Sequence, residues 1–209
     1  MSTRKKRRKS GGKWSDALTK QAKQEGYGAR SVYKLKEMDR RFGAVGRKGP
    51  VLDLGCAPGA WSRFVRERIG KKGRLVGVDL QEVLDYPGVF LQGSITEMEP
   101  ATLLNELGGR AALVLSDMAP FTTGNRFTDH VRQIELAGLA LDVAIAVLQP
   151  GGTFVVKVFD GEEVPGFATR LRGHFDKQRR VRPEATRTKS VEFFLVCQGF
   201  KPADSATNS

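Results

Sequence analysis

From residue 51 onward, short apolar runs alternate with segments in which apolar residues recur at helical spacing. Runs with few polar residues are typical of strands that are buried on both faces of a sheet. The predicted strands lie at residues 51–54, 74–79, 89–91, 112–115, 154–159, 175–182 and 191–198. The predicted helices lie at residues 60–69, 101–107, 129–148 and 163–173. This alternation predicts an α/β, Rossmann-like fold, with a mostly parallel seven-stranded sheet and helices on both faces.

Two breaks refine this picture. Only residues 183–190 join the last two predicted strands, a connection too short for a crossover, so we expect an antiparallel hairpin at one edge of the sheet. The sequence Pro150-Gly151-Gly152 is expected to close the long helix before the fifth strand begins.

The chain before residue 51 has a different pattern. Residues 14–25 and 29–42 are predicted helices, and the second carries Leu35, Met38 and Phe42 at helical spacing. We expect one domain over residues 14–202, with residues 14–49 as a basic helical extension. Residues 1–13 are low in complexity, and they and residues 203–209 are predicted to be disordered tails.

The charge is unevenly distributed. The chain has 35 basic and 23 acidic residues, and residues 1–50 hold 16 of the basic and 4 of the acidic ones, so they carry the whole excess of +12. This basic block favours nucleic acid as a partner over an anionic membrane or a merely solvated tail. Residues 170–189 form a second cluster with an excess of six basic residues, for which RNA binding and a solvated sheet edge both stay open.

Several classes are disfavoured by what the sequence lacks. No apolar run of about 20 residues predicts a membrane span, and no apolar stretch follows the basic start as in a secretory signal. A mitochondrial transit peptide stays open, because residues 1–15 contain no acid. Two cysteines fit a reducing compartment and cannot form a zinc cluster. We expect no metal site, since His130 and His174 lack ligand spacing and are predicted to be surface or helix-cap residues.

The segment from Asp53 to Trp61, DLGCAPGAW, follows a strand and opens a helix. Such a turn faces the ligand crevice of an open α/β sheet, and Gly55 and Gly59 would allow close approach of a ligand. The turn lacks both G-x-G-x-x-G and a basic residue, which disfavours a nicotinamide oxidoreductase. Asp79, at the end of the next strand, is placed to accept hydrogen bonds from ribose hydroxyls. A tight turn without a ligand is the structural alternative.

Four charged residues stand in or beside apolar segments. Lys157 interrupts an apolar strand, and a lysine is almost never fully buried without a partner. Asp117 ends the fourth strand, Glu192 opens the last one, and Lys34 flanks a helical apolar stripe. Each also has a structural interpretation: a lysine reaching water at an edge or a strand end, a turn cap, a surface acid and a snorkelling lysine.

The turn DLGCAPGAW resembles motif I of S-adenosylmethionine-dependent methyltransferases. Four further segments, at residues 31–35, 116–120, 155–159 and 190–196, extend the resemblance to the FtsJ/RlmE family of ribosomal RNA 2′-O-methyltransferases. The resemblance covers roughly residues 13–202, in the family's order. Two positions depart from the pattern: Ala60 stands where a second glycine is usual, and Ser94 where an acid is expected to hold the adenine amino group.

The resemblance implies S-adenosylmethionine as the cofactor, and Lys34, Asp117, Lys157 and Glu192 as the catalytic set. The implied cofactor-binding residues are Asp53, Gly55, Ala57, Pro58, Gly59, Ala60, Trp61, Asp79, Ser94 and Asp117. A lysine of ordinary pKa is protonated at neutral pH, whereas burial and a second ammonium lower that pKa. Lys157 is therefore the predicted general base, with Lys34 lowering its pKa and the two acids positioning both lysines.

The resemblance also implies the substrate: a uridine ribose in the peptidyl-transferase region of 23S ribosomal RNA, within a large ribosomal subunit. The candidate RNA-binding residues are Arg30, Lys34, Lys36, Arg40, Arg179, Arg180, Arg182 and Arg187. A cytoplasmic, monomeric protein is expected. Methylation of another RNA, and a non-catalytic ribosome assembly factor on the same fold, are the alternatives.

Overall fold

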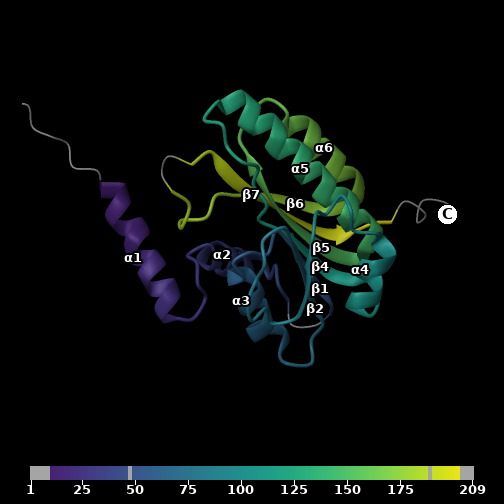
Figure 1. Cartoon of the computed structure of the whole chain (residues 1–209). Coiled ribbons are helices and arrows are strands. Elements are labelled where there is room, and N and C mark those ends of the chain that lie inside the picture. Colours follow the sequence, from purple (N-terminus) through teal and green to yellow (C-terminus); the bar gives the residue numbers. More distant parts are fainter. Residues whose placement is uncertain (1–9, 47–48, 188–189, 203–209) are drawn as a thin grey trace, which may run out of the picture.

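The computed structural model describes residues 10–46, 49–187 and 190–202. Its sheet has seven strands, in the order β3-β2-β1-β4-β5-β7-β6 (Figure 1). The strands are β1 (Val51–Leu54), β2 (Leu75–Asp79), β3 (Val89–Gln92), β4 (Ala111–Ser116), β5 (Leu148–Phe159), β6 (Phe175–Val181) and β7 (Glu192–Phe200). The first five strands run parallel, and β7 lies antiparallel between β5 and β6. The mostly parallel sheet with an antiparallel hairpin at one edge is thus confirmed.

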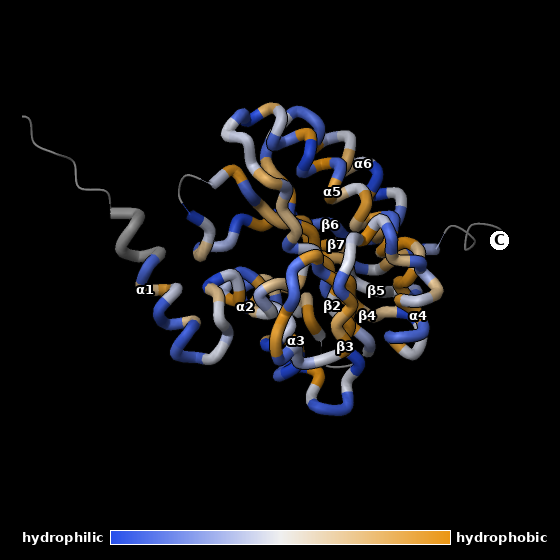
Figure 2. The backbone as a smooth tube through the Cα atoms, viewed as in Figure 1, coloured by the Kyte–Doolittle hydropathy of each residue, from blue (hydrophilic) through white to orange (hydrophobic). Residues whose placement is uncertain are grey.

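Six helices accompany the strands in the described part of the chain. They are α1 (Ser10–Gln24), α2 (Val32–Phe42), α3 (Ala60–Ile69), α4 (Pro100–Leu107), α5 (Arg126–Val147) and α6 (Val164–His174). Helices α4, α5 and α6 pack on one face of the sheet, and α2 and α3 pack on the other. Hydrophobic residues concentrate where these layers meet (Figure 2). No helix in the described ranges is long and apolar enough to cross a membrane.

Side-chain alternation on β5 decides what each face of the sheet carries. Phe154, Val156 and Val158 enter the core beneath α4, α5 and α6. Val155 enters the core beneath α2 and α3. Lys157 follows Val155 by two residues, so its side chain is directed to the α2 side of a central strand. This excludes the interpretation of Lys157 as an edge residue.

Most predicted boundaries lie within a few residues of the observed ones. Helix α1 begins four residues earlier than predicted, and α2 begins at Val32 because residues 30 and 31 form a turn. One boundary was wrong. Pro150-Gly151-Gly152 does not separate helix from strand: α5 ends at Val147, β5 starts at Leu148, and a register shift opposite Ala111 and Leu113 accommodates the sequence. The predicted tails at 1–13 and 203–209 lie outside the described residues, except for the start of α1.

Several charged residues lie at the carboxyl ends of the parallel strands, along one edge of the sheet. Asp79 is the last residue of β2, and Asp117 directly follows β4. The antiparallel β7 starts at this edge, where Glu192 pairs with Phe159 at the end of β5. Ligands of open α/β sheets bind at this edge.

The turn between β1 and α3 passes very close to the loop after β4. Gly55 has a φ of +74°, and a Cβ atom there would lie 2.4 Å from Cγ of Met118. Gly28 has nearly the same φ, +76°, but no atom lies within 4 Å of the place of its Cβ. A side chain at Gly28 would therefore meet only the penalty of the left-handed backbone, whereas one at Gly55 would also collide with Met118.

We predict that Gly28→Ala lowers the free energy of unfolding by about 1 kcal/mol, because only the left-handed backbone is penalised. Gly55→Ala adds overpacking against Met118 and should cost about 3 kcal/mol in total. Urea unfolding of both variants measures the difference. Equal losses would show that the Gly55–Met118 approach has no energetic weight.

Candidate active site

Two lysine–carboxylate pairs lie at the carboxyl edge of the sheet. The ammonium of Lys157 lies 3.1 Å from Oδ1 of Asp117 and also donates a hydrogen bond to the backbone carbonyl of Asp117. The ammonium of Lys34 lies 2.5 Å from Oε1 of Glu192. Lys157 and Lys34 are only 6% and 7% exposed. The four residues of the predicted catalytic set therefore form two largely buried pairs.

The ring of Phe194 connects the two pairs. Phe194 is opposite Lys157 in the β5–β7 register, so the two side chains share one face of the sheet. The ammonium of Lys34 lies 5.6 Å from the centre of this ring. Phe194 also packs against Trp61, with ring centres 5.6 Å apart. Lys34 reaches the edge of the sheet from α2 because the apolar face of that helix packs over β5 and β7.

The turn of residues 53–61 is tied to its neighbours by hydrogen bonds. The Asp79 carboxylate accepts the N–H of Ala57 at 2.8 Å and the N–H of Gln81 at 2.8 Å. The indole N–H of Trp61 donates to the carbonyl of Ser31 at 2.8 Å, so this predicted cofactor residue is buried and joins α3 to the start of α2. Gly59, with a φ of +90°, is the N-cap residue of α3. Asp79 thus shapes the turn itself.

Asp53 is a buried carboxylate, and one of its two oxygens lacks a hydrogen-bond partner. Its Oδ2 accepts the hydroxyl of Ser62 at 2.5 Å, whereas its Oδ1 has no hydrogen-bond partner in the structure. Burial, together with the nearby negative charges of Asp117 and Asp79, raises the pKa of Asp53 to about 7, although the hydrogen bond from Ser62 lowers it. The Asp53 carboxyl is therefore poised to release a proton when a positive group approaches.

A family model described as FtsJ-like methyltransferase matches residues 27–200. This chain belongs to the FtsJ-like methyltransferase family. The ribosomal RNA large subunit methyltransferase E of Desulfosudis oleivorans is 40% identical over 198 residues, covering 93% of this chain and 94% of that protein. The protein of the same name from Acinetobacter baylyi is 44% identical, covering 90% and 88%.

A solved structure gives the same result for the fold. The crystal structure of a Plasmodium falciparum protein described as a ribosomal RNA methyltransferase aligns with a TM-score of 0.72 at 30% identity. The alignment covers 82% of this chain and 97% of that one. The predicted Rossmann-like methyltransferase fold is therefore confirmed.

A methyltransferase of this family needs a methyl donor, and the residues at the turn fit a positively charged methyl donor. Asp53, Asp79 and Asp117 place three carboxylates around the turn. Asp117 contacts Lys157, whereas Asp53 and Asp79 accept bonds from a neutral hydroxyl and from backbone N–H groups. The sulfonium and amino groups of S-adenosylmethionine would supply the missing positive charge.

Other predicted cofactor residues of this family member lie around the same turn. Ala60 is buried in the first turn of α3, and Pro58 is exposed after a cis peptide bond with Ala57. Ser94 follows β3, and its hydroxyl lies 2.7 Å from the hydroxyl of Thr96. The Ser94 hydroxyl therefore takes part in a local turn. The acid expected at this position from the family pattern would instead place a negative charge here.

The predicted RNA-binding residues separate into two groups. Arg30 and Arg187 lie near the Lys34–Glu192 pair: partial burial lowers the pKa of Arg30, and the like charge of Arg187 lowers it further. Arg180 contacts Asp160 just beyond β5, so it also lies at the carboxyl edge. Arg179 lies on the other face of β6 from Arg180, the face covered by α2, where its guanidinium lies 5.4 Å from the centre of the Phe42 ring at the end of α2.

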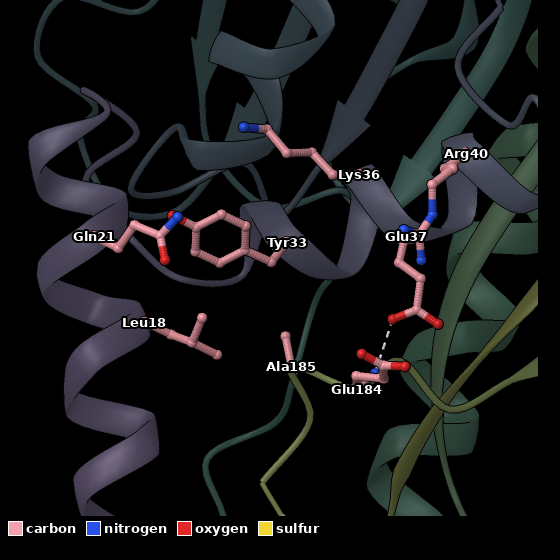
Figure 3. Close-up of a pocket in the computed structure, with 8 residues that line it drawn as sticks. All are labelled: Leu18, Gln21, Tyr33, Lys36, Glu37, Arg40, Glu184 and Ala185. Atoms are coloured by element: carbon pink, nitrogen blue, oxygen red, sulfur yellow. Dashed lines mark hydrogen bonds between the residues drawn. The ribbon is translucent and has the colours of Figure 1, made fainter.

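A hollow on the surface is lined by none of the four residues of the two ion pairs. Its volume is about 290 Å³, and α1, α2 and the loop before β7 form its walls (Figure 3). Its lining residues are Leu18, Gln21, Tyr33, Lys36, Glu37, Arg40, Glu184 and Ala185. Glu37 accepts the backbone N–H of Glu184 at 2.8 Å across it. Two candidate RNA-binding residues, Lys36 and Arg40, thus line this hollow together with two acids.

Sequence reasoning missed the residues that hold the strand ends together. Gln133 of α5 donates to the carbonyl of Lys157 at 2.9 Å and to that of Met118 at 3.3 Å. His130 was expected at the surface or in a helix cap; it is buried, with Nδ1 3.1 Å from the carbonyl of Phe159 and Nε2 accepting the N–H of Glu163 before α6. Both stand one helical turn apart on α5, and this shared face was the available signal.

The raised pKa of Asp53 predicts a specific dependence of stability on pH. An acid whose folded pKa exceeds its unfolded value of about 3.9 stabilises the fold below that value, and this contribution is lost as pH rises through about 7. Between pH 5 and pH 8, the parent should lose about 3 kcal/mol of unfolding free energy through the ionisation of Asp53. Asp53→Asn should lack this loss.

Urea unfolding at the two pH values measures this difference. Asp176→Asn, which changes an exposed carboxylate on the far side of the edge strand, is the matched control and should follow the parent. Parallel pH profiles for Asp53→Asn and the parent would show that Asp53 is ionised throughout.

Proposed function

We propose that this protein transfers the methyl group of S-adenosylmethionine to a ribose 2′-hydroxyl of 23S ribosomal RNA, on a uridine within the large ribosomal subunit. The observation that carries the proposal is the placement of Lys157. Its buried ammonium lies at the ligand edge of a methyltransferase sheet, beside Asp117 and on the same face as the Lys34–Glu192 pair. The proposed setting is a cytoplasmic monomer.

The names of the relatives support the substrate, since both curated proteins described above are ribosomal RNA large subunit methyltransferases. The excess of basic residues before residue 51 is consistent with an RNA partner. A non-catalytic assembly factor is less favoured, because such a protein would have no need for two buried lysines at this edge.

When bound, S-adenosylmethionine supplies an activated methyl group on a positively charged sulfur. The protein would hold it through the backbone of residues 55–59 and through the carboxylates of Asp53 and Asp79. A 2′-hydroxyl is a weak nucleophile until its proton is removed or shared. Lys157, once deprotonated, would accept that proton at Nζ as the hydroxyl oxygen bonds to the methyl carbon. The bond from the methyl carbon to sulfur would break at the same time, and its electron pair would leave with the sulfur as a neutral thioether.

The other three residues of the set would act on Lys157 and on the hydroxyl. Asp117 fixes the direction of the Lys157 ammonium through two contacts, one to its carboxylate and one to its carbonyl. Glu192 holds Lys34 through its carboxylate, and the Lys34 ammonium lies near the ring of Phe194. Orientation of the reacting groups then contributes to the rate together with the proton transfer.

We predict that Lys157→Ala lowers the rate of methyl transfer by about 100- to 10,000-fold, the range for loss of a general base. Binding of S-adenosylmethionine, followed by calorimetry, should be retained. Lys157→Arg should fail as well, because the guanidinium stays protonated. The assay uses labelled S-adenosylmethionine and large subunits from cells that lack the gene, with mapping of 2′-O-methylated nucleotides.

Lys71→Ala is the matched control. Lys71 is an exposed lysine in the turn after α3, at the opposite edge of the sheet, and its loss should leave turnover unchanged. Near-normal turnover of Lys157→Ala would refute the assignment of the base. Methylation at a base atom, in place of a ribose oxygen, would refute the proposed reaction.

The basic residues near Lys34 yield a separate prediction. Contacts to phosphates release counterions, so the affinity for RNA should fall steeply with salt. Arg30→Ala and Arg187→Ala should each weaken RNA binding and reduce the slope of log affinity against log salt by about 1. Titrations at several salt concentrations test this, and unchanged slopes would place the RNA on another surface.

A further inference from the structure

Two exposed aromatic rings lie after β4, one in the loop before α5 and one in the first turn of α5. Ten of the chain's twelve phenylalanines are buried or half-buried, whereas Phe121 and Phe127 are 91% and 68% exposed. Burying a phenylalanine stabilises a fold by about 1.5–3 kcal/mol, and the fold gains almost nothing of this from Phe121. The exposed ring of Phe121 is therefore available to a binding partner.

The position of Phe121 limits what that partner can be. Phe121 follows Asp117 by four residues, so their Cα atoms lie within about 14 Å of each other. Whatever covers the ring must therefore lie next to the substrate of the Lys157–Asp117 pair. The acids at the two ends of this loop are already engaged, since Asp117 pairs with Lys157 and Asp129 accepts bonds from Thr123 and Gly124. Residues 118–128 between them contain no acid and one arginine, Arg126, which suits a negatively charged partner.

Side chains at the start of α5 hold the loop that carries Phe121 through hydrogen bonds. The carboxylate of Asp129 accepts the N–H of Thr123 at 2.6 Å, its hydroxyl at 2.9 Å, and the N–H of Gly124 at 3.1 Å. The side chain of Asn125 accepts the N–H groups of Phe127 and Thr128 at the start of α5. These bonds fix the base of the loop, so stacking on Phe121 would cost little ordering of the backbone.

We propose that Phe121 is a stacking platform for an unpaired nucleobase of the RNA substrate, next to the ribose presented to Lys157. A ribose in single-stranded RNA is accessible when its nucleotide leaves the stack, and unstacked bases bind aromatic side chains face to face. The proposal rests on the proposed function, since it takes the RNA as given and adds a contact that selects single-stranded RNA near the target.

The test compares Phe121→Ala, Phe121→Leu and Phe121→Trp in methyl transfer to large subunits from cells lacking the gene. Loss of one stacked base should raise the KM for subunits about 5- to 150-fold in Phe121→Ala. Leucine should restore little of this and tryptophan most of it, because the contact requires an aromatic face. The KM for S-adenosylmethionine and the melting temperature should stay unchanged, since the ring is exposed.

Leu139→Ala is the matched control, because Leu139 is an exposed apolar residue of α5 away from this loop and should leave the KM unchanged. A Phe121→Ala KM within twofold of the parent, with the parent active, overturns the stacking proposal alone. An inactive parent overturns the proposed function, and the stacking proposal with it.

A photoreactive phenylalanine analogue at position 121 distinguishes RNA from protein as the covering partner. A crosslink on subunits to a nucleotide near the methylated ribose supports the proposal. A crosslink to a ribosomal protein, or to distant RNA, overturns it.

Discussion

The buried pair of Lys157 and Asp117 is the constraint around which this edge of the molecule is arranged. Removing two charges from water is costly, and such a pair stabilises a fold less than apolar residues of similar size would. Lys157 nonetheless stands in a central strand, between β4 and β7. Gln133 then fixes the carbonyls of Lys157 and Met118, so that the ends of β5 and β4 stay in register. The hydrogen bonds of Gln133 thus help to keep Lys157 beside Asp117.

Negative charge at the neighbouring turn is the complementary constraint. Asp53, Asp79 and Asp117 lie close enough for their charges to raise the pKa of Asp53. Alone, such a cluster destabilises the fold at neutral pH. It becomes favourable when a cation completes it, which links the conformation of the turn to occupancy by a positively charged donor. The close approach of Gly55 to Met118 joins this turn to the loop that carries Asp117, so the two constraints share one piece of backbone.

Hydrophobic periodicity predicted the strands and helices because each element buries a regular face. It could not predict that β7 inserts between β5 and β6, since strand order depends on packing between distant segments. The same limit applies to the site. The charged residues at 34, 117, 157 and 192 were visible as breaks in apolar patterns. The Lys157–Asp117 pair, however, arises from the pairing of β5 with β4, and the Lys34–Glu192 pair arises only when β7 is placed beside β5. His130 was misread because hydrophobic periodicity counts only apolar residues, whereas the face of α5 that His130 shares with Gln133 is polar.

The two kinds of unusual residue at this edge point to different parts of one task. Buried charges such as Lys157 and Asp53 are costly to the fold and are held by fixed partners, as befits groups whose geometry must not change during a reaction. The exposed ring of Phe121 is costly in the opposite sense, because an apolar surface is left in water on a loop whose base is fixed by Asp129. The N–H of Thr123 lowers the pKa of Asp129, so the carboxylate that holds the loop stays ionised at neutral pH. A rigid interior that positions the chemistry and an exposed ring that meets the substrate are both expected where a large, flexible polymer must present one atom to a small site.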